Sequence, residues 1–106
     1  MSMDINKMLK QVEQMQAEMA KAQEELAKET VEASAGGGMV TVKATGALEI
    51  TEIKIDPQAI DPDDPELLAD MVLAAVNEAI RSAQGLAQSK LGGAIGDLGG
   101  LGLPGL

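Results

Sequence analysis

Lysines are the residues of this chain whose spacing suits a recognisable chemistry. Lys7, Lys21 and Lys28 occupy one heptad position of the N-terminal segment, and Lys10 lies on an adjoining stripe. In a helix, separations of 14 and 7 residues correspond to about 21 and 10 Å along the axis. Ammonium groups in such a row can meet successive phosphates and bind nucleic acid without reading its sequence. The same spacing also fits a solvated face supported by pairs such as Glu24 with Lys28, and spacing alone favours this second interpretation.

The composition argues against catalysis, metal binding and base stacking. The chain has no histidine and no cysteine, which removes thiolate chemistry, disulfides and ordinary structural zinc sites. Asp61 and Asp63 have the spacing that opens a calcium loop, but the central glycine is absent and prolines interrupt the segment. Stacking on single-stranded bases is excluded because there are no aromatic residues. We therefore expect no enzyme activity, no cofactor and no small-molecule substrate.

The formal net charge of −9 argues at first against a nucleic-acid partner, but the acidity is concentrated in the middle of the chain. Residues 29–66 carry two lysines against nine acids. Residues 1–28 carry four lysines against five acids, and residues 67–106 carry two basic residues against three acids. The two ends are therefore close to neutral and leave room for a weak cationic surface.

The N-terminal segment is predicted to be a helix over about residues 4–28. Its apolar residues recur at alternating steps of three and four, which places them on one stripe. The helix would be about 38 Å long, so part of the stripe should overhang a compact body about 30 Å wide and require another chain to cover it. A long two-stranded coiled coil and packing across a sheet are the two alternatives, and the Gln- and Glu-rich flanks favour the sheet. The stripe consists of Ile5, Met8, Val12, Met15, Met19, Ala22 and Leu26.

The middle of the chain predicts three short antiparallel strands, over about residues 30–34, 39–45 and 48–55. Glycines at 36–38 and the turn at 45–47 connect them, and such short connections imply a meander. In the third strand the apolar parity shifts between Ile50 and Ile53. Either a bulge near Thr51 and Glu52 or burial of both faces explains that shift.

A second helix is predicted over about residues 65–89, after an acidic loop that Asp64 ends as a helix cap. The main apolar face of this helix comprises Leu68, Met71, Val72, Ala75, Ala79, Ile80 and Ala83. Apolar side chains extend almost all round the first half, which three strands cannot cover alone. We therefore expect a homodimer whose interface contains Leu67, Met71, Leu73, Ala74, Val76, Ile50 and Ile53.

The sequence fits a single α+β domain over residues 1–91, followed by a glycine- and leucine-rich segment, 92–106, predicted to be disordered. No stretch approaches the roughly 20 apolar residues of a membrane span, and the N-terminus lacks the apolar core of a signal peptide. The expected location is the cytosol, with no membrane partner.

Several short stretches, taken together in their order and spacing, resemble the YbaB/EbfC family of bacterial nucleoid-associated proteins over nearly the whole chain. These stretches are Met-Leu-Lys-Gln at 8–11 with Met-Gln at 15–16, Gly-Gly-Met-Val-Thr-Val at 37–42, Ile-Lys-Ile-Asp-Pro at 53–57, Ala-Ala-Val-Asn-Glu-Ala at 74–79 and Gly-Leu-Pro-Gly-Leu at 102–106. The resemblance implies an α-β-β-β-α protomer, a tweezers-like homodimer, and binding to double-stranded DNA with low sequence preference. A role in nucleoid organisation or gene regulation is implied as well.

In this family the DNA-binding surface is attributed to the projecting first and last helices. Carried over by position, the resemblance points to Lys7, Lys10, Lys21 and Lys28 on the first helix, with Arg81 and Lys90 as candidates on the second. The acidity of the chain is a departure from what a DNA-binding surface favours. An alternative function is a dimeric protein-interaction adaptor that uses the Met-rich stripe and the apolar tail.

Overall fold

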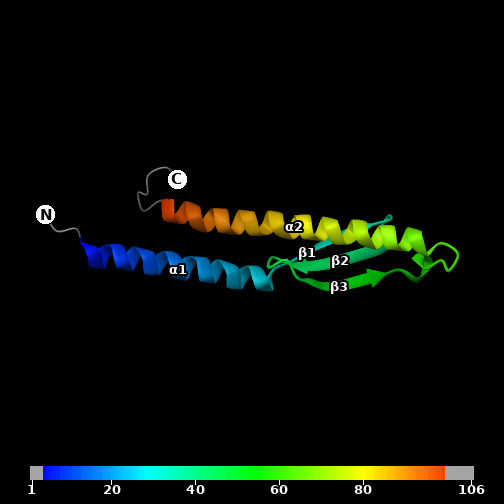
Figure 1. Cartoon of the computed structure of the whole chain (residues 1–106), viewed down its shortest axis with the longest axis horizontal. Helices are drawn as coiled ribbons and strands as arrows, with labels where there is room; N and C mark the ends of the chain where they lie inside the picture. Colours follow the sequence, from blue (N-terminus) through cyan, green and yellow to red (C-terminus); the bar gives the residue numbers. More distant parts are fainter. Residues whose placement is uncertain (1–3, 100–106) are drawn as a thin grey trace.

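The computed structural model describes residues 4–99, and the side chains of residues 4–93, as an elongated rod with the predicted α-β-β-β-α order (Figure 1). Its extents are 78 × 22 × 16 Å, and its radius of gyration is 20.6 Å. A compact chain of this length would have a radius of gyration of about 13 Å. The prediction of a compact body is therefore wrong. The elements are α1 (Ile5–Lys28), β1 (Thr30–Ala35), β2 (Val40–Thr45), β3 (Ile50–Ile55), the 3-10 turn η1 (Pro57–Ala59) and α2 (Pro65–Gly99).

The three strands form an antiparallel meander in the order β1-β2-β3, as predicted. Three glycines with positive φ, residues 36–38, make the first turn. In the second turn the buried hydroxyl of Thr45 accepts hydrogen bonds from the backbone N–H groups of Ala47 and Glu49. Lys43 pairs with Glu52 and Ala44 pairs with Ile50, so Thr51 is an extra residue. The bulge predicted near Thr51 is confirmed.

Helix α2 covers one face of β1 and β2 and forms the core with them. Ala75, Ala79 and Ala83 of α2 are fully buried, and they pack against a sheet face that includes Val40 and Val42. Their small side chains let the helix backbone approach the sheet closely. The predicted main face of this helix is thus confirmed as the face that packs on the sheet. The Asp64 side chain accepts a hydrogen bond from the N–H of Leu67, which confirms the predicted cap.

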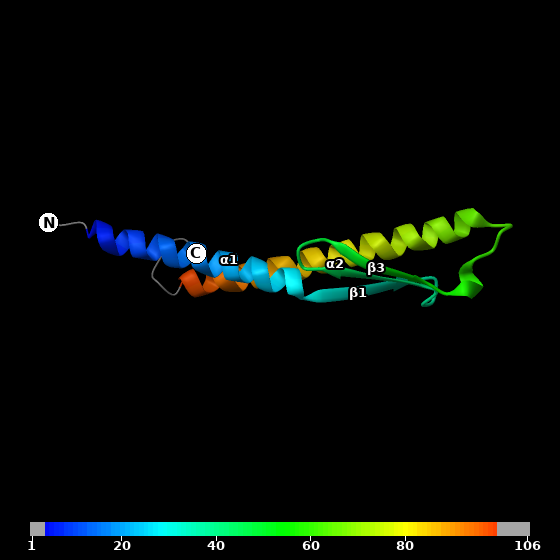
Figure 2. The ribbon, with the colours of Figure 1, turned by 90° about the horizontal axis from the view of Figure 1, so that it is seen from below.

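Helix α1 does not pack across the sheet, and that expectation is wrong. Figures 1 and 2 show α1 beyond the end of the sheet, beside the C-terminal half of α2. Two causes explain this position. The sheet face is already occupied by α2, and Glu29 joins α1 to β1 through extended backbone (φ −83°, ψ 142°), so the chain continues outward without folding back. The predicted overhang is confirmed, since Ile5 is 62% exposed and Val12 is 49% exposed.

Helix α2 is longer than its sequence predicts, because it continues to Gly99 instead of ending near Ser89. Residues 92–99, predicted to begin a disordered tail, are therefore helical in the structure. Each glycine weakens a helix by about 1 kcal/mol relative to alanine, but elongating an established helix avoids the cost of a new nucleus. Residues 100–106 of that predicted tail lie outside the described residues. In the part of the chain that the structure describes, neither helix has an apolar stretch long enough to cross a membrane.

Candidate nucleic-acid interface

The candidate interface is built on α1, which projects from the sheet as an arm. The helix begins at Asp4, whose side chain accepts a hydrogen bond from the N–H of Lys7 at 3.1 Å. At the other end, the buried side chains of Ala22 and Leu26 anchor it to the rest of the molecule. Between these ends the arm has little contact with the sheet, and most of its side chains are exposed.

The four predicted lysines of α1 are all exposed, and they occupy the side of the helix away from its apolar stripe. From Lys7 to Lys28 the row extends about 31 Å along the helix axis. One turn of duplex DNA is about 34 Å long. The arm thus presents ammonium groups over a distance that corresponds to about one turn of DNA.

The lysines of this row have few competing partners. Lys28 lies 3.5 Å from Glu24, but both side chains are more than 70% exposed. Such an exposed pair is weak and exchanges readily for another anion. Among residues 4–93, Lys7, Lys10 and Lys21 form no ion pair. Their charges are therefore available to phosphates.

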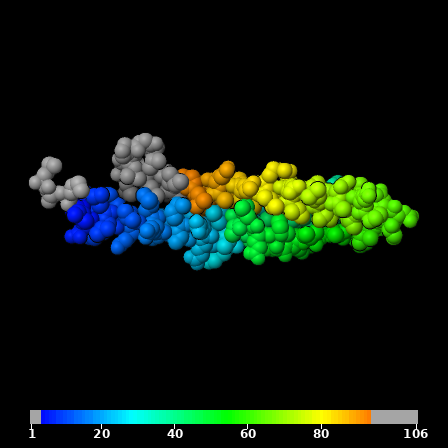
Figure 3. Space-filling model, in the orientation of Figure 1, coloured from blue at the N-terminus to red at the C-terminus, as the bar shows by residue number. Residues whose placement is uncertain are grey.

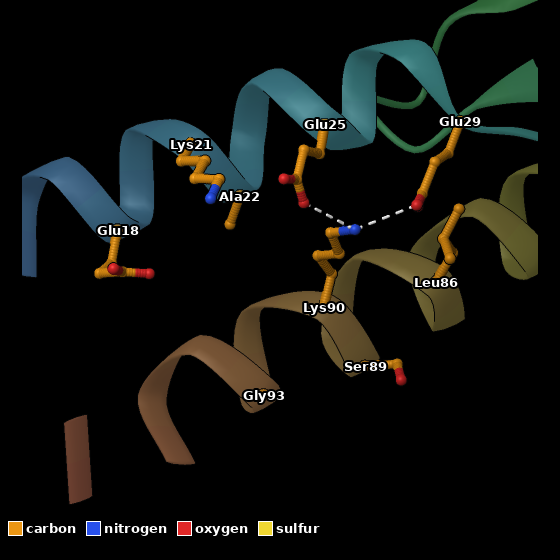
Figure 4. Close-up of a pocket in the computed structure, with 9 residues that line it drawn as sticks. All are labelled: Glu18, Lys21, Ala22, Glu25, Glu29, Leu86, Ser89, Lys90 and Gly93. Atoms are coloured by element: carbon orange, nitrogen blue, oxygen red, sulfur yellow. Dashed lines mark hydrogen bonds and ion pairs between the residues drawn. The ribbon is translucent and has the colours of Figure 1, made fainter. Parts of the chain in front are cut away.

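The two cations predicted on α2 have different surroundings. Arg81 lies on the part of α2 that covers the sheet, and its guanidinium binds Glu78 at 2.7 Å. Lys90 lies opposite α1 and reaches across to Glu25 at 2.9 Å and Glu29 at 3.0 Å (Figure 4). These two carboxylates raise the pKa of Lys90. The structure thus places Arg81 apart from the lysines of α1, whereas Lys90 lines the same hollow as Lys21 (Figure 4).

The other end of the rod carries acidic residues without any basic residue among them. Residues 56–70 carry six carboxylates and no lysine or arginine. They form the loop and the start of α2 at the end opposite the α1 arm (Figure 3). On the arm itself, Glu18 and Glu25 line the hollow that faces α2. The charge is therefore uneven along the rod: the loop end is strongly acidic, whereas α1 carries four lysines against four glutamates.

A second candidate surface is an apolar groove of about 510 Å³ between α2 and β3, in which Ile55 and Leu73 are lining residues. The strand β3 has its isoleucines on the face that α2 covers, because Ile53 pairs with Val42 and Ile55 with Val40. However, α2 lies over β1 and β2, so Ile53 remains 45% exposed. A single copy of the chain leaves this strip of sheet uncovered.

The predicted dimer-interface residues divide around this groove. Leu73 and Val76 line it, and Ile53 lies on the adjacent sheet face. Met71 and Ile50 pack against the core of their own protomer, and Val76 contacts both that core and the groove. Leu67 and Ala74 are exposed and do not line the groove. The sequence did not single out Ile55 or Ala69, because only the register of β3 against α2 reveals that they line it.

The chain is similar to bacterial nucleoid-associated proteins over nearly its whole length. A sequence profile of the YbaB/EbfC DNA-binding family matches residues 1–98. A nucleoid-associated protein of Acetivibrio thermocellus is 52% identical over 103 residues, which cover 97% of this chain and 89% of the relative. A nucleoid-associated protein of Streptomyces avermitilis is 50% identical over 103 residues, covering 97% of this chain and 91% of the relative.

A fold comparison gives the same architecture in a solved structure. The crystal structure of an uncharacterized protein from Helicobacter pylori superposes with a TM-score of 0.77 at 20% sequence identity. The superposition covers 89% of this chain and 99% of that one. At this level of identity the likeness concerns the fold alone.

Proposed function

Because the chain belongs to the YbaB/EbfC DNA-binding family, we propose that it binds double-stranded DNA with little sequence preference through the lysine row of α1. The observation that carries this proposal is the row itself: four exposed lysines on a projecting arm, over about one turn of DNA. Lysines on a smooth helix face contact phosphates as point charges and do not discriminate bases. Binding of this kind suits nucleoid organisation, in keeping with the names of the relatives, and it can influence gene regulation by occupying DNA.

We propose further that the working unit is a homodimer joined through the apolar groove between α2 and β3. Support comes from Leu73, which is 60% exposed, and from the uncovered isoleucines of β3. A second copy that covers this strip would bury apolar surface and present two arms at once. Two arms double the number of phosphate contacts, which compensates for the few lysines on each.

The test is a salt titration of binding to a random-sequence DNA duplex. If a dimer engages about six phosphates, the plot of log affinity against log salt should have a slope near −5. Reversing the charges in a Lys7→Glu, Lys10→Glu, Lys21→Glu variant should abolish DNA binding without changing helix content or oligomer mass. A slope near zero, or undiminished binding by the variant, would contradict the proposal.

A second candidate function is a protein-interaction adaptor, favoured by the exposed apolar stripe at the free end of α1. Ile5 and Met8 of the stripe, and Leu9 beside it, are each more than 50% exposed. A Met-containing apolar face adapts to partner helices. A pull-down with the wild-type chain and with a Met8→Glu, Leu9→Glu variant tests this function. A partner that binds both equally would exclude the stripe as its docking surface.

A further inference from the structure

The orientation of the α1 arm depends on a small junction around Glu29. This residue ends α1 and directly precedes β1, and its N–H donates to the carbonyls of Glu25 and Leu26. Its own carbonyl accepts a hydrogen bond from the N–H of Gly46 at 3.1 Å. In the described part of α1, only Ala22 and Leu26 are buried. A helix of 24 residues is thus held near one end, like a lever.

One side chain of α2 spans this junction. The Lys90 ammonium lies 2.9 Å from Glu25, in the last part of α1, and 3.0 Å from Glu29, just after the helix. The side chain of Lys90 is only 28% exposed, and it lies in the hollow between the two helices beside Leu86 and Gly93 (Figure 4). The two carboxylates therefore connect both sides of the junction to a single point on α2.

We propose that Lys90 is a positioning residue that clamps the α1 arm against α2, and that it is not a phosphate contact. Two carboxylates surround one ammonium, so the cluster has a net negative charge and does not attract phosphate. Two of the three N–H donors of Lys90 are directed at these carboxylates. The direction of its pKa agrees, because the hydrogen bonds to Glu25 and Glu29 raise it.

The clamp matters because a small rotation at the junction becomes a large displacement at the tip. The arm is about 36 Å long, so a rotation of about 10° at Glu29 moves its end by about 6 Å. Successive phosphates of one DNA strand are about 3.4 Å apart along the axis. A loosened arm would thus lose the register between its lysines and the phosphates. This consequence for DNA rests on the proposed function, whereas the clamp itself does not.

The first test measures amide hydrogen exchange of the full chain without DNA. The variants are Lys90→Gln, Lys90→Arg and the double variant Glu25→Gln, Glu29→Gln. The control is Glu24→Gln, which removes a carboxylate of the same helix that pairs only with Lys28. We expect exchange in residues 5–28 to be roughly threefold faster in Lys90→Gln and in the double variant. Lys90→Arg should restore slow exchange, and Glu24→Gln should leave it slow.

Exchange in the buried strand β2 shows whether a variant has simply lost its fold. If β2 exchanges faster in Lys90→Gln as well, the comparison of Lys90→Arg with the double variant still tests the clamp. Unchanged exchange in α1 for both Lys90→Gln and the double variant would overturn the proposal, whatever happens with DNA. Faster exchange in α1 together with no DNA binding by the wild type would support the clamp and refute the proposed function.

The second test measures DNA affinity, for which simple electrostatics and the clamp predict changes of opposite sign. The double variant removes two negative charges per protomer, so simple electrostatics predicts tighter DNA binding. The clamp predicts binding roughly threefold weaker, because the arm is no longer held. Glu24→Gln, with one carboxylate removed outside the clamp, should bind as tightly as the wild type or more so. If the double variant binds more tightly and Lys90→Gln flattens the salt dependence, Lys90 is a phosphate contact and the clamp is refuted.

Discussion

If the lysine row binds DNA, the salt dependence of binding should report the number of phosphate contacts as well as the binding itself. Neutralising Lys21 as Lys21→Gln removes one charge from each arm, hence two from a dimer. With about six phosphates engaged by the wild type, the slope of log affinity against log salt is about −5.4. With four engaged, it becomes about −3.6. The affinity of the wild type should therefore fall by about 10³-fold between 50 and 200 mM salt, and that of the variant by about 10²-fold.

The matched control is Lys54→Gln, which changes the net charge by the same amount. Lys54 is 67% exposed on β3, where it lies 3.8 Å from Glu52 and away from the arm. Fluorescence anisotropy of a labelled random duplex at five salt concentrations gives both slopes. Equal slopes for Lys21→Gln and Lys54→Gln would show that the affinity follows net charge alone, and the assignment of the row would then be wrong.

Three further predictions concern the dimer, the junction and pH. Leu73→Asp places a charge in the apolar groove and should convert the proposed dimer to a monomer in light scattering. Leu67→Asp, about equally exposed but outside the groove, should leave the proposed dimer intact. Gly46→Ala should displace α1 and speed its amide exchange, because the added Cβ would lie 2.8 Å from the carbonyl oxygen of Leu26. Gly85→Ala, whose added Cβ would have no atom within 4 Å, should instead stabilise α2 by about 1 kcal/mol in urea denaturation. Hydrogen bonding to Lys90 lowers the pKa of Glu25 below its ordinary value of 4.5. The stability that this pair contributes is therefore present above pH 4.5 and is lost as the pH falls through the lowered pKa. Amide exchange in α1, relative to β2, should accelerate in that acid range, and no acceleration would contradict the pairing.

The order of elements was predictable from the sequence because each has its own period. Alternation in β2, where Val40, Val42 and Ala44 are buried, is a local property that survives folding. The parity shift after Ile50 likewise marked a bulge that the register confirms. The position of α1 was not predictable in this way. An apolar stripe has the same spacing whether it meets a sheet or another helix. The occupation of one sheet face by α2, together with the extended backbone at Glu29, excludes the first arrangement.

The candidate site shows the same division between local and distant information. The four lysines of α1 share a face because helical periodicity puts them there, so spacing predicted that they lie together. Spacing alone favoured a solvated face, and only the family resemblance pointed to DNA. Lys90 differs, since 61 residues separate it from Glu29 and no spacing rule connects them. The sequence contains only a partial signal: Glu25 and Glu29 are four residues apart, a like-charge spacing that destabilises a helix and that a nearby cation would relieve. Which cation they share depends on the antiparallel pairing of α1 with α2.

The polarised charge of the rod reconciles a net charge of −9 with a DNA-binding surface. Twenty-four residues of α2 separate Glu66 from Lys90, which lies beside the inner end of the arm, and this distance is about 36 Å. At physiological ionic strength the screening length is about 8 Å, so the acidic loop contributes little to the potential at the lysine row. The charges that remain near the row are those of the arm itself, where four lysines balance four glutamates. Two of these glutamates line the hollow facing α2. We therefore expect the loop end to repel DNA more strongly than the α1 arm does. Net charge alone would have excluded this function, whereas the distances along the rod allow it.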